Sequence, residues 1–251
     1  MAALVALAAW VLPLDAAPLA APCPPPSSEL LFHSCWGQAR LAIRLLPEDL
    51  PLSAAPQAGR RLIVTGAYTG RDTRGEGLPK PVGLFIHQGQ VLNPNLGRMD
   101  GVLVVDPADG VPRLHHRARL QLAENSYDLT MLEQRRQFIR AAASAGVSVM
   151  QSHLLIADGK VDVRPGDGAP AFVRRLLFIE TSGFGIFQTE SAMTLHDAAI
   201  RLAQAHAPKM ALNLDMGSYD FCRFSQGGRE IGCGILGGTA KLSNLLLMTS
   251  D

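Results

Sequence analysis

One stretch of the chain constrains the fold more than any other. Residues 194–203 carry apolar side chains at helical spacing, and Thr194 with Asp197 has the pattern of a capping box. A short turn follows, and the apolar run 211–214 then reads as a strand that leads to Asp215. The predicted order is helix, turn, strand and carboxylate. A carboxylate at the end of a rigid strand, beside a loop, is a frequent place for chemistry.

The rest of the chain is read mostly as strands. From Arg40 onward, short apolar or alternating runs are separated by turn signals. A second helix is predicted from a cap at Thr130 to about Ala145, with Gly146 as its stop. Many strands with two substantial helices predict an α+β fold, in which a mixed, largely antiparallel sheet carries two main helices. With 251 residues, 47% of them hydrophobic, the chain can bury the core of a single domain.

The N-terminal segment differs from the rest. Residues 1–14 are almost entirely apolar, and small residues typical of a cleavage site follow them. We expect residues 1–28 to be a signal-like segment with a proline-rich linker, and residues 29–251 to form the domain. A disordered extension rich in alanine and proline is the alternative. Because the apolar run is short, no stable membrane span is expected after signal removal.

A hairpin near the end of the chain places two cysteines opposite each other. A two-residue turn at Gly227-Gly228 pairs Gln226 with Arg229, and counting outward sets Cys222 against Cys233. Such a pair lies at a distance suited to a disulfide, which predicts a Cys222–Cys233 bridge in an oxidising compartment. We therefore expect a periplasmic or secreted protein. Two reduced thiols in a cytosolic hairpin are the alternative.

The other cysteines and the charges exclude several classes of site. Cys23 and Cys35 are left to pair with each other, and only this leftover count supports the pair. No cysteine spacing or Cys/His cluster indicates zinc, and His115-His116 has no third ligand at metal spacing, so no metal site is predicted. The net charge is +1 without a dense basic run, so no nucleic-acid partner is expected.

The order of several short motifs resembles the phosphodiester glycosidase family. Residues 194–199 and 211–218 are similar to that family's T-L-x-E-L-A and A-L-N-L-D-G-G-x-S segments. Further matches follow the family's order between residues 40 and 248; they lie at 64–68, 81–86, 151–160, 174–175 and 241–246. The resemblance implies hydrolysis of a sugar-1-phosphodiester at its anomeric carbon, with a carbohydrate or sugar-phosphate ligand and no organic cofactor.

The resemblance also implies roles for particular residues. Asp215 is expected to stabilise an oxocarbenium-like transition state or to act as acid or base, although an aspartate at a strand's end can simply cap a turn. Arg175 is expected to bind the phosphate through its paired donors, while Arg174 beside it leaves open which of the two faces the site. The residues expected to line the substrate pocket are Thr65, Gly66, Gln151, Ser152, His153, Asn213, Gly217 and Ser218.

Four substitutions depart from the family pattern. Thr65 replaces an asparagine, His153-Leu154 replaces Gly-Pro, and Met216 and Ile179 each replace a glycine. Because a glycine near a ligand permits close backbone approach, the last two are expected to narrow or reshape the cleft. Two main hypotheses follow: an active hydrolase in the cell envelope or outside the cell, and a catalytically degenerate protein that binds a glycan or phosphodiester there. A structural envelope protein without a ligand is a third.

Overall fold

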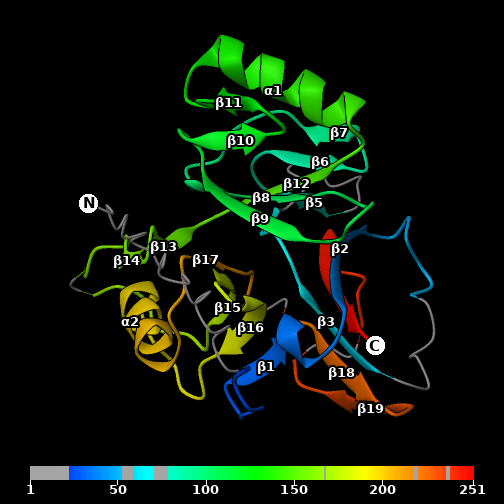
Figure 1. Ribbon diagram of the computed structural model, residues 1–251, viewed down its shortest axis with the longest axis vertical. Coiled ribbons are helices and arrows are strands. Elements are labelled where there is room, and N and C mark those ends of the chain that lie inside the picture. The colour runs from blue at the N-terminus through cyan, green and yellow to red at the C-terminus, as the bar shows by residue number, and fades with distance from the viewer. Residues whose placement is uncertain (1–22, 53–58, 71–78, 167, 217–219, 236–237) are drawn as a thin grey trace, which may run out of the picture.

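The computed structural model describes residues 23–52, 59–70, 79–166, 168–216, 220–235 and 238–251. Within these residues strands account for 43% and helices for 13%, and every strand pairing is antiparallel. The strands form three large sheets and two small hairpins rather than one sheet (Figure 1). The fold is therefore β-rich, and the predicted α+β architecture with a mixed sheet and two main helices is wrong.

Sheet 1 has six strands and carries helix α2 (Leu195–Ala205) on one face. Ala198, Ala199 and Leu202 of this helix are buried against apolar side chains of the sheet, because they lie on one side of the helix. The strand order is β1 (Leu30–His33), β16 (Gly183–Gln188), β15 (Arg175–Glu180), β17 (Met210–Asn213), β13 (Leu154–Ala157) and β14 (Lys160–Val161).

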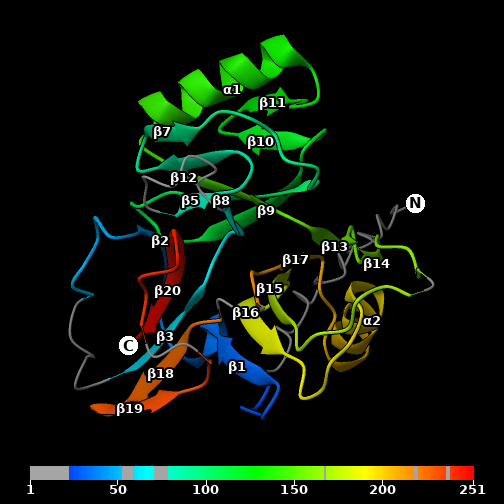
Figure 2. The ribbon, with the colours of Figure 1, turned by 180° about the vertical axis from the view of Figure 1, so that it is seen from behind.

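Sheet 2 has five strands and lies beneath helix α1 (Leu132–Ser144) and the hairpin β10 (Leu120–Leu122) and β11 (Asn125–Tyr127). Phe138 and Ala142 of the helix pack with Val149 and other buried side chains of the sheet. Both ribbon views place α1 at the end of the molecule far from α2 (Figure 2). The strand order is β7 (Gln90–Asn93), β6 (Phe85–His87), β12 (Ser148–Ser152), β8 (Gly101–Val105) and β9 (Pro112–His116).

Sheet 3 joins strands from both ends of the chain. Its order is β19 (Arg229–Gly232), β18 (Cys222–Gln226), β3 (Arg60–Thr65), β20 (Asn244–Ser250) and β2 (Ala39–Leu45). Two short elements lie near it: the 3-10 helix η1 (Ser34–Trp36) contacts β2, and the hairpin β4 (Thr69–Gly70) and β5 (Lys80–Pro81) follows β3 along the chain.

The cysteine hairpin has the predicted register. Gln226 pairs with Arg229 across a turn in which Gly227 and Gly228 both have positive φ, a conformation that favours glycine. Cys222 and Cys233 are joined by a disulfide with their Cα atoms 4.8 Å apart. A second disulfide joins Cys23 to Cys35.

One hydrophobic core is shared by the three sheets. Leu212 of sheet 1, Leu103 of sheet 2 and Val64 of sheet 3 belong to the same buried cluster. Strands β12 and β13 follow each other with only His153 between them, so the chain passes from sheet 2 to sheet 1 at this residue. We call the junction between these sheets the seam. Side chains at the seam are held on strands that pack against a shared core, and their positions are therefore rigid.

The helix boundaries test the predicted caps. The Thr194 hydroxyl accepts a hydrogen bond from the Asp197 N–H at 3.1 Å, which confirms the cap of α2. The predicted cap of α1 at Thr130 is wrong, because the Thr130 hydroxyl donates to Asp128 instead. The helix begins after Met131, whose side chain makes no capping hydrogen bond. The predicted stop is confirmed, since Gly146 follows the helix with φ +69°.

The predicted signal-like segment stays a prediction. Residues 1–22, which make up most of the predicted signal-like segment, lie outside the described residues. Within the part of the chain that is described, no helix combines the length and apolar character that crossing a membrane requires.

Candidate functional site

Asp215 lies just beyond β17, at the seam between sheets 1 and 3. Its N–H donates to the Gly66 carbonyl at 2.9 Å, directly after β3. Its carboxylate Oδ2 accepts a hydrogen bond from the Thr69 N–H at 3.1 Å, and the residue is 9% exposed. The backbone of residues 66–69 therefore holds Asp215 at both its main chain and its side chain.

The surroundings make this carboxyl unusual. Burial raises the pKa of Asp215 to about 6; the Thr69 hydrogen bond opposes the rise, and the nearby Asp220 carboxylate adds to it. A carboxyl with this pKa exchanges its proton near neutral pH. Such a group is suited to acid or base work, which a carboxyl of ordinary pKa performs less well at that pH.

Asn213, at the end of β17, connects the strand to Tyr68. Its Nδ2 donates to the Tyr68 hydroxyl and, at 2.9 Å, to the Leu214 carbonyl. Its Oδ1 is buried and has no hydrogen-bond partner within the described part of the chain. An unsatisfied buried carbonyl oxygen is a costly feature that a bound donor could relieve.

The charges of both Asp215 and Arg174 act on Tyr68. Burial raises its pKa to about 12; the Asn213 hydrogen bond opposes this, the charge of Asp215 adds to it and the charge of Arg174 lowers it. Tyr68 is therefore a neutral phenol that accepts from Asn213 and keeps its own O–H as a donor. Tyr68 was not among the predicted site residues, although it ends the segment 64–68, one of the segments on which the motif resemblance rests.

His153 lies beside Tyr68 at the crossover between sheets 2 and 1. The two rings meet edge to face, with centroids 5.6 Å apart. Burial lowers the pKa of His153; the Asp100 carboxylate opposes this and the Arg174 charge adds to it. The imidazole is thus held neutral at pH 7 and offers one donor and one acceptor.

Arg175 is enclosed inside the protein. It has no exposed surface, and its Nη1 donates to Asp220 Oδ1 at 2.7 Å. Its Nε donates to Gln188 Oε1 at 3.0 Å. The structure therefore places Arg175 inside the protein, where it joins β15 and β16 to the segment before β18. The phosphate-binding role expected for it stays a prediction.

Arg174 is also buried, but different groups hold it. It is 7% exposed, and backbone carbonyls hold its guanidinium: Nε donates to Met193 at 3.0 Å and Nη2 to Pro170 at 2.7 Å. The guanidinium also lies over the Phe172 ring, 5.0 Å from its centroid. Within the described residues it forms no ion pair with a carboxylate. Sequence reasoning left the choice between the two arginines open, and the structure associates Arg174 with Tyr68.

Two of the predicted pocket residues, Gln151 and Ser152, are enclosed at the end of β12. The Gln151 Oε1 accepts from the N–H groups of Leu84 at 3.0 Å and Gly97 at 2.8 Å, and Ser152 donates to the Asn213 carbonyl. Neither side chain is exposed. Both therefore act as supports here: Gln151 fixes two neighbouring segments of sheet 2, and Ser152 holds the end of β17.

Thr65 and Gly66 support the site from β3. The Thr65 hydroxyl accepts from the Phe221 N–H at 2.8 Å and is buried. A Cβ added at Gly66 would lie 2.3 Å from Oδ1 of Asn244, so only glycine fits between this amide and Asp215. Gly217 and Ser218, which were also predicted to line the pocket, lie outside the described residues.

Two further features lie away from these residues. A cavity of about 830 Å³ between β9 and the end of α2 is lined by His116, Arg119 and Lys209 among others, and by none of the predicted site residues. Among the described residues, a group with metal-like spacing occurs at Cys23, His33 and Cys35, where both cysteines are oxidised to a disulfide.

Comparison with known proteins gives distant likenesses. No family model matches the chain, and no curated protein matches it. One similar solved structure is the zebrafish N-acetylglucosamine-1-phosphodiester alpha-N-acetylglucosaminidase catalytic domain, auto-inhibited by its pro-peptide, with 13% identity and a TM-score of 0.48 over 87% of this chain and 74% of that one. Another is a hypothetical protein from Synechocystis, with 12% identity and a TM-score of 0.48 over 85% of this chain and 57% of that one.

Proposed function

We propose that the chain is a hydrolase of the phosphodiester glycosidase type, acting on a sugar-1-phosphodiester. The observation that supports it best is the placement of Tyr68 beside Asp215: its hydroxyl accepts from Asn213, two residues before Asp215, and the next residue, Thr69, donates its N–H to the Asp215 carboxyl. The charges of Asp215 and Arg174 both act on the pKa of Tyr68. A carboxylate suits a carbon that gains positive charge, and a guanidinium suits a phosphate that leaves with negative charge. The site offers both around one hydroxyl group.

In the proposed reaction, water replaces the phosphate at the anomeric carbon. The bond between that carbon and the phosphate oxygen breaks, its electron pair leaves with the phosphate, and the sugar passes through an oxocarbenium-like state. Asp215 in its carboxylate form accepts a proton from the attacking water, for which a pKa of about 6 is well placed at neutral pH. The products are a free sugar and a phosphomonoester.

Arg174 takes the phosphate-binding role that the sequence assigned to Arg175. A guanidinium has five N–H donors, and the carbonyls of Met193 and Pro170 occupy two of them. The same two contacts fix its position, so that little conformational entropy is lost when an anion binds. Tyr68 and His153 then add neutral hydrogen-bonding groups beside it.

Binding without turnover is the second candidate, and Thr65 favours it. The phosphodiester glycosidase family carries an asparagine at this position, which the motif resemblance implies is near the ligand. Here the shorter side chain engages the Phe221 backbone and cannot present an amide. A site that keeps Asp215 and Arg174 without that amide would bind the ligand and turn it over slowly or not at all.

The proposed location is the cell envelope or the outside of the cell. The two disulfides, Cys23–Cys35 and Cys222–Cys233, support this, because disulfides form and persist in oxidising compartments.

The test is hydrolysis of a panel of sugar-1-phosphodiesters by the purified protein. Asp215→Asn is expected to lower kcat at least about 100-fold, the smallest loss typical for a positioned base. Arg174→Gln is expected to lower kcat/KM by roughly 10- to 100-fold, as for a lost charge-assisted hydrogen bond. Arg140→Gln, an exposed arginine on α1, is the matched control and should leave both constants unchanged.

The outcomes separate the candidates. Turnover that depends on Asp215 establishes the hydrolase. Binding of the same phosphodiesters without turnover, lost in Arg174→Gln and kept in Arg140→Gln, supports the binding protein instead. Turnover that survives Asp215→Asn, with the fold intact by circular dichroism, contradicts the proposed mechanism.

A further inference from the structure

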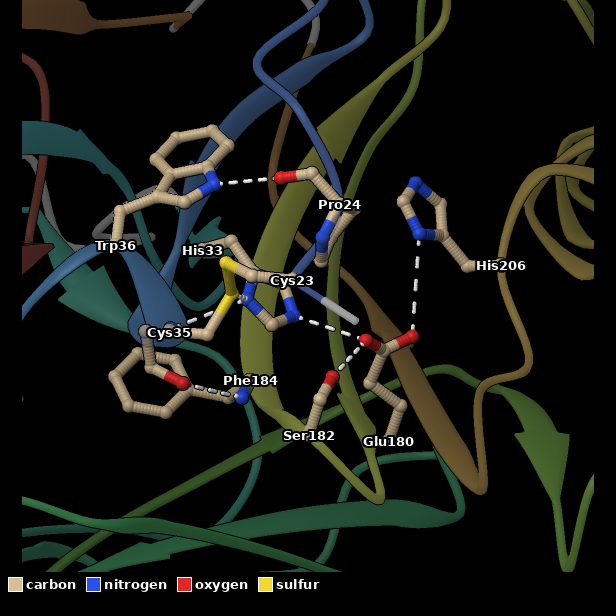
Figure 3. The surroundings of a disulfide bond; sticks show 10 residues. Cys23, Pro24, His33, Cys35, Trp36, Glu180, Ser182, Phe184 and His206 are labelled. Atoms are coloured by element: carbon tan, nitrogen blue, oxygen red, sulfur yellow. Dashed lines mark hydrogen bonds and ion pairs between the residues drawn. A yellow bond between two sulfur atoms is a disulfide. The ribbon is translucent and has the colours of Figure 1, made fainter. Parts of the chain in front are cut away.

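A second group of reactive side chains surrounds the Cys23–Cys35 disulfide, at the edge of sheet 1 formed by β1 (Figure 3). Cys23 is exposed and Cys35 is half-buried in η1. His33, the last residue of β1, has no exposed surface, and its Nδ1 lies 2.6 Å from the Sγ of Cys35. An imidazole is therefore in direct contact with one of the two sulfur atoms.

The hydrogen bonds assign the tautomer of His33. Its Nδ1 accepts from the Cys35 N–H at 3.2 Å, so this nitrogen carries a lone pair. The proton is then on Nε2, which donates to the Glu180 carboxylate at 3.1 Å. Burial lowers the pKa of His33, while Glu180 opposes the shift, so the ring is neutral with its basic nitrogen beside the sulfur.

Glu180 is itself held in place. The Ser182 hydroxyl donates to its Oε1, and Nδ1 of His206 lies 3.9 Å from its Oε2. Figure 3 shows these contacts in a row, from the sulfur through the imidazole to the carboxylate. A sulfur, a histidine and an orienting carboxylate are the three groups that stabilise a thiolate and its partner imidazolium.

We propose that Cys23–Cys35 is a site of thiol–disulfide exchange, at which a dithiol attacks the exposed Cys23 and Cys35 leaves as a thiolate stabilised by His33. His33 is neutral before the attack, and its Nδ1 takes the proton that the attacking thiol gives up. The imidazolium formed in this way lies against the Cys35 sulfur and lowers the pKa of this leaving thiol, and a leaving thiol of lower pKa departs faster. The exposure of Cys23 and the contact of His33 with Cys35 assign different roles to the two sulfurs.

The electron and proton balance is complete with a dithiol as the only co-reactant. A thiolate of the dithiol forms a bond to Cys23 Sγ, and the bond between the two protein sulfurs breaks with its electron pair on Cys35. The second thiol of the dithiol then attacks the dithiol sulfur that is bonded to Cys23, and Cys23 leaves. The dithiol is oxidised to a disulfide, the protein disulfide is reduced to two thiols, and the two protons of the dithiol pass to Cys23 and to the pair of Cys35 with His33.

The second disulfide of the same molecule is an internal control. Cys222 is 2% exposed, and the Cys222–Cys233 bridge lies at the end of the β18–β19 strand pair. No histidine contact to either of its sulfurs occurs among the described residues. Rates for the two disulfides can therefore be compared in one sample.

The experiment is reduction by limiting dithiothreitol, followed by alkylation and mass spectrometry of the cysteine peptides. Cys23–Cys35 is expected to open at least roughly tenfold faster than Cys222–Cys233, and Glu180→Gln and His33→Gln are expected to slow it by roughly tenfold. Glu180→Gln keeps the side-chain shape, which keeps the test valid if His33→Gln does not fold. His87→Gln, in a histidine–carboxylate pair with Asp49, is the matched control and should leave the rate unchanged.

A monothiol trap tests the direction of attack. Glutathione in place of dithiothreitol should leave its adduct on Cys23 and the alkylating label on Cys35. An adduct mainly on Cys35, or rates in Glu180→Gln and His33→Gln equal to that of the unmodified protein, would overturn the proposal.

Discussion

Nη1 of Arg175 donates a hydrogen bond to Oδ1 of Asp220 across 2.7 Å, and both side chains are almost fully shielded from water. This pair ties β15, in sheet 1, to the segment that leads into β18, in sheet 3. It lies beneath the candidate site, because the Asp220 charge raises the pKa of Asp215 after the larger effect of burial and against the Thr69 hydrogen bond. The pair thus connects the packing of two sheets to the protonation of the site.

Removing the negative member of the pair should be costly. Asp220→Asn leaves Arg175 buried with its charge uncompensated, and we expect the free energy of unfolding to fall by about 3 kcal/mol. Urea denaturation measures this loss. The exposed pair of Arg113 with Asp109 provides the control, since Asp109→Asn should cost less than about 1 kcal/mol. Equal losses in the two variants would show that burial does not decide the cost.

The raised pKa of Asp215 predicts a pH-dependent stability. Its folded-state pKa is about 6 against an ordinary 3.8, so the folded protein binds this proton more tightly than the unfolded chain. The resulting stabilisation is complete below about pH 4 and is lost as the pH rises through about 6. Asp215→Asn, which is neutral throughout, should therefore match the unmodified protein at pH 4 and exceed its free energy of unfolding by about 2–3 kcal/mol at pH 8.

Urea denaturation of both proteins across this pH range measures the difference. A gap that is largest at pH 4, or that does not vary with pH, would contradict the raised pKa. The midpoint can be checked directly from the carboxyl carbon of Asp215 by NMR, which should titrate near pH 6.

Gly66 should not tolerate even a methyl group. The Cβ of Gly66→Ala would meet Oδ1 of Asn244, which accepts from the Ala67 N–H at 2.7 Å. We expect a loss of about 1–3 kcal/mol in the free energy of unfolding, because either this amide or the backbone beneath Asp215 must move. Gly232→Ala, in β19 with open space around it, is the control and should change stability by less than about 0.5 kcal/mol. If the Gly66→Ala protein is as stable as this control, the Asn244 side chain can move aside without a cost in stability, which contradicts the prediction.

The Cys222–Cys233 disulfide should stabilise one hairpin more than the rest of the molecule. Replacing both cysteines by serine is expected to lower the free energy of unfolding by about 3 kcal/mol, as for a short closed loop. Strand β19 is exposed along its whole length and pairs only with β18 among the described strands. Hydrogen exchange should therefore rise first in β19, and a uniform rise across sheet 3 would contradict a local role.

The features that depend on contacts between neighbouring residues could be predicted from the sequence. The cap of α2 involves Thr194 and Asp197, and the cysteine register depends on the Gly227-Gly228 turn; both involve contacts within a few residues. The strand before Asp215 was predicted for the same reason. The predicted cap at the start of α1 was wrong, because the Thr130 hydroxyl donates a hydrogen bond to Asp128 instead of capping the helix.

The remainder depends on partners far away in the chain. Neighbouring residues on a strand point to opposite sides, so Arg174 and Arg175 could not be told apart until Asp220 and Gln188 were placed. The fold class was wrong for a related reason. Strand runs can be recognised locally, but their division among three sheets depends on pairings such as β1 with β16 and β2 with β20.

The central position of β20 in sheet 3 has a consequence for biosynthesis. This strand lies between β2 and β3, and Ile43 and Ile63 face Leu246 and Leu247 across it. The ribosome therefore makes β2 and β3 long before the strand that joins them exists. Sheet 3 can close only after β20 has been translated, so β2 and β3 must wait for this partner while the residues between them and β20 are made.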